Sequence, residues 1–266
     1  MRVSHDSDIT LFSRYECKYL VDRAVIPQLR AFVRPFMNPD RYAALHAGNR
    51  YSICSLYLDS DDLALYRQTV GGEKNRFKLR ARTYSDGPDA PVFLEIKGKR
   101  NNVVQKRRAR VSREVARSVI LRRPVRRPPD ETTTDEQQRD VERFAGHMTL
   151  VEAKPVVRVR YQREAYESAA GDPVRITVDT DLCHAVTFDD TLSHADGPWV
   201  PTPVDGAIVE IKFTERFPSW VADLVRALGL TQQPVPKYVM CVEWFLNGDR
   251  RAPLAIAGFM LPARRG

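Results

Sequence analysis

Charged residues alternate with apolar residues along several segments of this chain. Because successive residues of a β-strand point to opposite faces of the sheet, such a segment collects its charges on one face. Guanidinium and ammonium groups bind phosphate, and carboxylate oxygens bind hard divalent cations. These patterns therefore indicate a site for phosphate groups and a metal ion. The pattern Glu-x-Lys occurs at Glu16/Lys18, Glu95/Lys97 and Glu210/Lys212, and basic residues alternate at Lys78/Arg80/Arg82 and Lys106/Arg108/Arg110.

Eight segments with this alternation are expected to form β-strands. Short stretches with helical periodicity lie between several of them. We therefore expect an α+β protein, with an antiparallel sheet and helices packed outside it. The expected strands are RYECKYLV (Arg14–Val21), YSICSLYL (Tyr51–Leu58), RFKLRARTY (Arg76–Tyr84), VFLEIKGK (Val92–Lys99), VVQKRRARV (Val103–Val111), PVVRVRYQREAY (Pro155–Tyr166), PVRITVDT (Pro173–Thr180) and AIVEIKF (Ala207–Phe213).

Short polar residues mark the starts of the expected helices. Asp22 precedes RAVIPQLRAFV, Asp61-Asp62 precedes LALYRQTV, and Ser112 precedes REVARSVIL. Such side chains accept hydrogen bonds from the first free backbone amides of a helix. Pro218-Ser219 precedes WVADLVRALGL, and Gly229 is expected to end that helix. The link KGKRNN predicts a hairpin between the fourth and fifth strands.

The segment from Arg122 to Asp140, RRPVRRPPDETTTDEQQRD, differs from the rest of the chain in composition. Because it holds Pro, Thr and charges and almost no apolar residue, we expect an exposed loop at about 122–140. Strand patterns occur on both sides of it, so we expect one domain over residues 1–266. Its RRPVRR also suits a nucleic-acid patch, but a solvated loop is the simpler interpretation, and we expect no nucleic-acid partner.

The composition indicates a globular protein with an anionic partner. The chain has 266 residues, with 42 Lys and Arg against 34 Asp and Glu. The formal net charge of +8 favours nucleotides, polyphosphate, nucleic acid or acidic lipid as partners. The four cysteines are widely spaced and form no CxxC pair, which is typical of a reducing compartment. Since no apolar run approaches the roughly 20 residues of a membrane span, we expect a cytoplasmic protein without a span.

The charged strand faces have two interpretations. Each face, taken alone, suits an ordinary antiparallel sheet with one wet and one buried side. If the sheet closes into a barrel, the same faces line its interior, where confined Lys and Arg repel one another without a polyanion. The recurrence of Glu-x-Lys favours the second interpretation. It predicts a chain of phosphates as the ligand, with Mg²⁺ or Mn²⁺ held by carboxylates.

A family resemblance follows from the order of these motifs. RYECKY, KLRAR, FLEIKGK, RVRYQR, RITVD and VEIK, followed by PKY, resemble the VTC domain, the polyphosphate polymerase domain of the vacuolar transporter chaperone type. That family belongs to the CYTH group, or triphosphate tunnel metalloenzymes, and has bacterial members. The resemblance spans roughly Phe12 to Trp244. It implies an antiparallel eight-stranded β-barrel whose interior, a triphosphate tunnel, binds a nucleoside triphosphate or polyphosphate.

The resemblance also implies roles for individual residues. Transfer of the γ-phosphoryl group of ATP to a polyphosphate chain needs alignment and charge neutralisation rather than a protein nucleophile. The implied catalytic residues are Arg80, Arg82, Lys97, Arg163 and Lys212. The implied substrate-binding residues are Lys18, Lys106, Arg108, Tyr161, Arg175 and Lys237. Glu210 is the implied ligand of Mn²⁺ or Mg²⁺, with Glu16 and Glu95 as further candidates.

Three other functions use the same residues or the same net charge. Triphosphatase relatives begin with Glu-x-Glu-x-Lys, but here Arg14 takes the first position, which disfavours a two-metal hydrolytic site. A triphosphatase nevertheless remains an alternative, as does a sensor that binds polyphosphate or nucleotide without turnover. A nucleic-acid binder would need stacking aromatics among its basic residues, and little such interleaving is present. The sequence leaves the metal preference, the oligomeric state and any membrane-protein partner open.

Overall fold

All eight expected strands form in the computed structural model. It describes residues 14–101, 103–124, 134–168, 173–204, 206–214 and 216–248. Two short strands, β2 and β9, were not expected. The strands are β1 (Arg14–Val21), β2 (Met37–Pro39), β3 (Arg50–Asp59), β4 (Asn75–Thr83), β5 (Val92–Arg100), β6 (Val103–Val111), β7 (Lys154–Ser168), β8 (Arg175–Val186), β9 (Val200–Pro201) and β10 (Ala207–Thr214).

The sheet is mostly antiparallel, and with its helices it confirms the α+β class. The strand order is β1-β10-β8-β7-β3-β4-β5-β6, while β2 pairs with β7 and β9 pairs with β8. Within the described residues β1 and β6 stay at the two ends of this order, so a closed barrel is not confirmed. The chain divides into two compact units, and β7 and β8 each contribute to both. The expectation of one domain stays a prediction.

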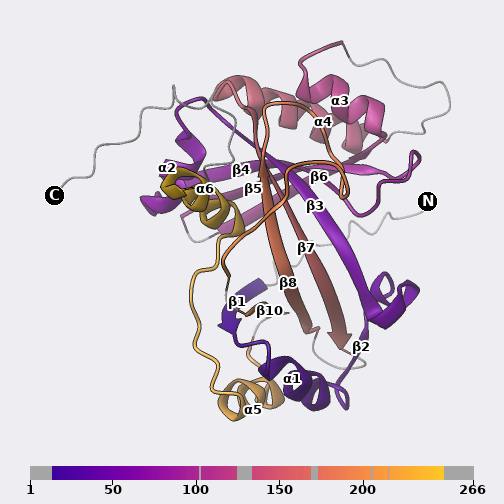
Figure 1. The fold of residues 1–266 in the computed structure, drawn as a ribbon, viewed down its shortest axis with the longest axis vertical. Helices are drawn as coiled ribbons and strands as arrows, with labels where there is room; N and C mark the ends of the chain where they lie inside the picture. Colours follow the sequence, from indigo (N-terminus) through magenta and orange to yellow (C-terminus); the bar gives the residue numbers. More distant parts are fainter. Residues whose placement is uncertain are drawn as a thin grey trace, which may run out of the picture. The chain divides into compact units, whose positions relative to one another are not determined.

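The first unit comprises the described residues within 1–50, 164–179 and 205–235. In it β1, β10 and the start of β8 pair antiparallel, and helices α1 (Val25–Val33) and α5 (Ser219–Ala227) lie side by side (Figure 1). The unit also holds two short 3-10 helices, η1 (Ala43–Leu45) and η2 (Ala47–Asn49). Its core gathers alternate strand residues with the apolar helix faces, including Val209, Ile211, Leu29 and Leu224. Because those strand residues face the core, their neighbours in sequence face away from it.

Gly206 is a position where the backbone requires glycine. Its φ of +118° lies in a region that L-residues rarely adopt, and a Cβ there would lie 2.0 Å from the carbonyl oxygen of Val21. We expect Gly206→Ala to lower the free energy of unfolding by at least about 1–3 kcal/mol, the usual cost of such strain. Thermal unfolding measures the loss. Gly146→Ala in a helix, where a Cβ meets nothing within 4 Å, is the control and should be neutral or stabilising. Equal melting temperatures for Gly206→Ala and the wild type would contradict the expected strain.

The second unit comprises the described residues within 51–163, 180–204 and 236–266. Its strands β3 to β6 pair in sequence order, and α3 (Arg113–Ile120) and α4 (Asp135–Leu150) pack against β4 to β6 (Figure 1). The core between them includes Leu79, Leu94, Phe144 and Met148. Helices α2 (Ala64–Val70) and α6 (Lys237–Gly248) lie beside each other in the same unit.

The expected exposed loop at 122–140 is partly wrong, because α4 begins at Asp135. Thr134 Oγ1 accepts a hydrogen bond from the Gln137 backbone amide, and the Gln137 side chain accepts one from the Thr134 amide. This capping box supplies partners for amides at the start of the helix. Asp140 is buried on the first turns of α4. Residues 125–133 lie outside the described part of the chain.

Of the other expected helix caps, Ser112 at α3 is confirmed, whereas the residue before α1, Ala24, has no side-chain cap. Ser112 caps α3 through the Val115 amide, and Asp22 accepts a hydrogen bond from the Ala24 amide before α1. The segment LALYRQTV forms α2, but Asp59 and Ser60 rather than Asp61 accept hydrogen bonds from its first amides. No helix in the described ranges has the length and apolar character that a membrane crossing requires.

Candidate phosphate-binding site

The strand register of the second unit brings the charged residues of β4, β5 and β6 together. Residues paired across β3 to β6 share a face, and the opposite face is the apolar core described above. The fixed alternation of side chains therefore places nearly all the predicted basic residues of these strands on one face. The three cross-strand rows are Lys78–Lys97–Lys106, Tyr57–Arg80–Glu95–Arg108 and Ser55–Arg82–Phe93–Arg110.

Glu95 lies at the centre of this face, with its side chain 1% exposed. Arg80 Nε donates to Glu95 Oε2 at 2.6 Å, and Arg82 Nε lies 4.0 Å from the same oxygen. Lys106 Nζ and Arg108 Nε lie 2.7 and 3.2 Å from Oε1. We call these five residues the arginine–glutamate cluster. Four basic side chains share one carboxylate, so the cluster has an excess of positive charge.

The protonation states in the cluster follow from burial and from neighbouring charges. Burial raises the pKa of Glu95, but Arg80, Arg82 and Lys106 outweigh it and hold that pKa well below its usual range. Burial lowers the pKa of Arg80, but Glu95 and Tyr57 outweigh it and raise that pKa. Both groups are therefore charged at neutral pH. A buried charge is stable only when it is paired, so Glu95 compensates the cations around it.

Aromatic and hydroxyl side chains hold the arginines in place. Arg80 Nη1 donates to the Tyr57 hydroxyl at 3.1 Å, and Arg82 Nε donates to Ser55 Oγ at 3.0 Å. Arg108 Nη2 donates to the Tyr84 hydroxyl at 3.0 Å, and its guanidinium lies 3.6 Å from the centroid of the Phe93 ring. Sequence reasoning did not select these partners or Lys78 as site residues. The alternation of Lys78 with Arg80 and Arg82 in the sequence marks Lys78 as a candidate site residue, whereas no sequence pattern marks the partners of the arginines.

Tyr161 connects two further predicted residues to this face. Arg82 Nη2 donates to the Tyr161 hydroxyl at 3.3 Å. The Arg163 guanidinium and the Lys237 ammonium lie 5.3 and 5.0 Å from the centroid of the Tyr161 ring, which indicates cation–π contacts. Strand β7 supplies Tyr161 and Arg163, while Lys237 is the first residue of α6. All the predicted residues of the second unit therefore lie on or around the charged face.

The remaining predicted residues form a second group in the first unit. Glu16, Lys212 and Arg175 are paired across β1, β10 and β8, and Lys18, Glu210 and Thr177 form the next row. Lys212 Nζ lies 2.5 Å from Glu210 and 3.9 Å from Glu16, and Lys18 Nζ lies 2.7 Å from Glu16. Arg175 donates to Asp40. Here two carboxylates share two lysines, so their charges are nearly balanced.

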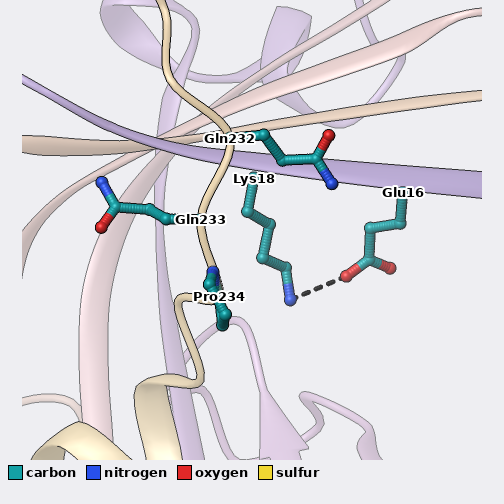
Figure 2. A pocket seen from close by; sticks show the side chains of 5 residues that line it. All are labelled: Glu16, Lys18, Gln232, Gln233 and Pro234. Atoms are coloured by element: carbon teal, nitrogen blue, oxygen red, sulfur yellow. Dashed lines mark ion pairs between the residues drawn. The ribbon is translucent and has the colours of Figure 1, made fainter.

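A hollow of about 300 Å³ opens beside this second group. Figure 2 shows Glu16 and Lys18 joined by their ion pair, with the segment Gln232–Pro234 next to them. The Gln233 amide donates to the Lys18 carbonyl, and Gln232 forms an isolated bridge with Tyr19. These backbone contacts fix the segment against β1. The hollow is thus lined by a charged pair and by two amide side chains.

Among the three predicted metal ligands, Glu210 and Glu16 remain candidates for holding a divalent cation, whereas the surroundings of Glu95 disfavour one. Glu95 already faces four cations, and a metal ion there would add to the positive excess. Glu210 and Glu16 instead approach one common ammonium, and Thr177 Oγ1 in the same row is buried with no hydrogen-bond partner among the described residues. The described side chains form no group of three or more His, Cys, Asp or Glu that could hold a metal. A bound cation would therefore need phosphate oxygens as additional ligands, as Mg²⁺ commonly does.

Comparison with known proteins identifies the family. Residues 13–246 match the model of the VTC domain. The chain belongs to the VTC domain family. The matched range contains every residue of both charged groups. The resemblance based on the charged motifs is therefore confirmed, although no comparison tests the role of any single residue.

Curated relatives are similar over most of this chain. The vacuolar transporter chaperone complex subunit 4 of Trypanosoma brucei brucei is 26% identical over 272 residues, which cover 86% of this chain and 33% of that protein. The subunit 4 of Schizosaccharomyces pombe is 24% identical over 267 residues, covering 85% of this chain and 36% of the relative. This VTC domain chain thus spans about a third of the length of these relatives.

A solved structure, that of the PH1819 protein from Pyrococcus horikoshii OT3, aligns with 87% of this chain and 99% of its own. Its TM-score is 0.44 and the sequence identity is 12%, so the likeness carries no argument about function.

Proposed function

We propose that this VTC domain is a polyphosphate polymerase. It would transfer the γ-phosphoryl group of ATP to the end of a polyphosphate chain and release ADP. The arginine–glutamate cluster is the observation that carries the proposal, because its buried positive excess calls for an anion with several charges. Membership of the VTC domain family supports polyphosphate and ATP as that anion. We further propose that the sheet closes into the eight-stranded triphosphate tunnel of the CYTH group.

The cluster would act by alignment and by electrostatic stabilisation. The contacts described use two of the five N–H donors of Arg80 and two of those of Arg82. The remaining donors suit the oxygens of a phosphate chain, which arginine binds in a bidentate manner. Lys97, Arg163 and Lys212 complete the proposed catalytic set. The chain itself would be bound by Lys18, Lys106, Arg108, Tyr161, Arg175 and Lys237.

Mn²⁺ or Mg²⁺ is the proposed cofactor, with Glu210 as its principal protein ligand and Glu16 as a neighbour. A metal ion in such a site neutralises negative charge on non-bridging phosphate oxygens. The Lys212 ammonium reaches both carboxylates, so it would neutralise the one that the cation does not bind. Glu95 is better explained as the counter-ion of the cluster than as a metal ligand.

Replacing Glu210 with glutamine tests the metal assignment. The change is nearly isosteric but removes a charged ligand, so we expect activity to need at least about tenfold more Mn²⁺. EDTA should abolish activity in both proteins. Asp61→Asn, which removes an exposed carboxylate bonded to Lys154, is the matched control and should leave the Mn²⁺ titration unchanged. An unchanged titration in folded Glu210→Gln protein would remove Glu210 from the metal site.

Product analysis tests the proposed function against its alternatives. The protein would receive ATP, Mn²⁺ and a short phosphate primer, and chain growth would be followed on a gel. Long phosphate polymers are the expected product. Release of orthophosphate alone would support a triphosphatase, and binding without any product would support a polyphosphate or nucleotide sensor.

We also propose that the protein acts in the cytoplasm. Within the described residues the four cysteines are free thiols, and Cys54 and Cys241 are buried. Free thiols are typical of a reducing compartment, which agrees with a cytoplasmic site of action on ATP.

A further inference from the structure

Asp59 is a buried carboxylate at the end of β3 that the proposed chemistry does not use. It accepts hydrogen bonds from the backbone amides of Ser60, Leu65 and Tyr66, each at 2.8 Å. The last two belong to α2, whose start Asp59 therefore fixes. Its Oδ2 also accepts a hydrogen bond of 2.5 Å from the hydroxyl of Tyr238. The carboxylate thus joins α2 to the first turn of α6.

Tyr238 lies between this anchor and the charged face. Its ring stacks on the ring of Tyr57, with centroids 4.9 Å apart and an interplanar angle of 21°. The residue before it, Lys237, extends its ammonium to within 5.0 Å of the Tyr161 ring centroid. A shift of Tyr238 would therefore move the backbone from which the Lys237 side chain extends. All of these residues belong to the second unit.

From these contacts we infer that Asp59 is a positioning residue: through its hydrogen bond with Tyr238 it fixes the first turn of α6 and holds the Lys237 ammonium over Tyr161, where it binds the phosphate chain. The inference rests on the proposed function, because it takes Lys237 as a ligand of phosphate. It goes beyond that function in naming the buried group that orients this ligand. Asp59 itself is fully buried, so it would act through Tyr238 and not by touching the phosphate chain.

Anchoring would strengthen phosphate binding because an anchored lysine is less flexible than an unanchored one. A lysine side chain has four rotatable bonds and loses considerable entropy when one conformation is selected. Fixing the backbone at Lys237 lowers that loss before the phosphate chain arrives, which is preorganisation. A tyrosine–carboxylate hydrogen bond suits this role because a carboxylate oxygen accepts a short, strong bond and the tyrosine side chain is rigid.

The test is a double-mutant cycle read by calorimetric binding of inorganic tripolyphosphate. Tyr238→Phe keeps the ring and its stacking but removes the hydroxyl, and Lys237→Met removes the ammonium. We expect Tyr238→Phe alone to weaken binding by about fivefold, a typical effect of losing one hydrogen bond. In the Lys237→Met background the same change should have almost no effect, because the residue that Tyr238 positions is already absent. A merely structural role would give the same loss in both backgrounds.

Tyr166→Phe is the matched control, because it also deletes a hydroxyl bonded to a buried carboxylate, Glu164 at 3.0 Å. It should lower the melting temperature without weakening tripolyphosphate binding. Equal losses from Tyr238→Phe in both backgrounds, or no loss in either, would overturn the inference while leaving the proposed function intact. Failure of the wild type to bind tripolyphosphate at all would overturn the proposed function, and the inference with it.

Discussion

Replacing Arg82 with alanine is expected to slow polyphosphate chain growth by about tenfold to a hundredfold. Arg82 is 7% exposed in its side chain, and Ser55 and Tyr161 hold its guanidinium on the charged face. A hydrogen bond to a charged partner contributes about 1.5–3 kcal/mol. If the contact tightens in the transition state, its loss appears in the rate rather than only in substrate binding. Steady-state kinetics with ATP and a phosphate primer measures the effect.

Two further variants separate this role from a general effect of charge. Arg80→Ala should slow chain growth to a similar degree but also lower the melting temperature, because Arg80 makes the shortest contact to Glu95. Arg107→Ala removes the same charge from β6, but Arg107 is paired with Ile96 and points to the other face. We expect it to retain nearly full activity. If all three variants lost activity equally, net charge rather than the geometry of the face would explain the result.

The second large effect concerns stability and is expected for Glu95→Gln. The change leaves Arg80, Arg82, Lys106 and Arg108 without their shared counter-ion. Removing one partner from a buried ionic network typically costs about 3–5 kcal/mol, so the free energy of unfolding should fall by about that amount. Denaturant unfolding measures the fall. Tripolyphosphate should restore more stability to the variant than it adds to the wild type, because it replaces the lost negative charge.

The pH dependence of stability provides an independent test of Glu95. Its pKa in the folded protein is held well below the ordinary value of 4.5. The unfolded state therefore takes up a proton first as the pH falls, and the stability due to Glu95 is lost below about pH 4.5. The difference in unfolding free energy between wild type and Glu95→Gln should be constant above this pH and shrink below it. A constant difference down to pH 3 would show that the charge of Glu95 is not what stabilises the cluster.

The sequence predicted the strands well because their signal is local. Alternation with a period of two depends only on neighbouring residues, and it located all eight long strands. The same period fixed which residues share a face, so Arg80 and Arg82 could be grouped with Lys97, Lys106 and Arg108 before any pairing was known. The start of α4 was missed because the polar residues before and after Thr134 look alike in composition. Only the capping box of Thr134 and Gln137 distinguishes the residues before the helix from those within it.

The roles of individual charges were decided by the tertiary structure. Glu16, Glu95 and Glu210 occur in the same short pattern, yet Glu95 is buried among four cations while Glu16 and Glu210 share Lys212. The difference arises from which strands pair beside each glutamate, and that pairing joins residues far apart in the chain. The bond between Asp59 and Tyr238 spans 179 positions and has no local pattern at all. The sequence by itself therefore determined that a charged strand face exists, because side-chain alternation is a property of the single strand. Only the folded chain decided which carboxylate neutralises arginines, which ones share a lysine and which one anchors a helix, because each of those depends on partners brought together by strand register and helix packing.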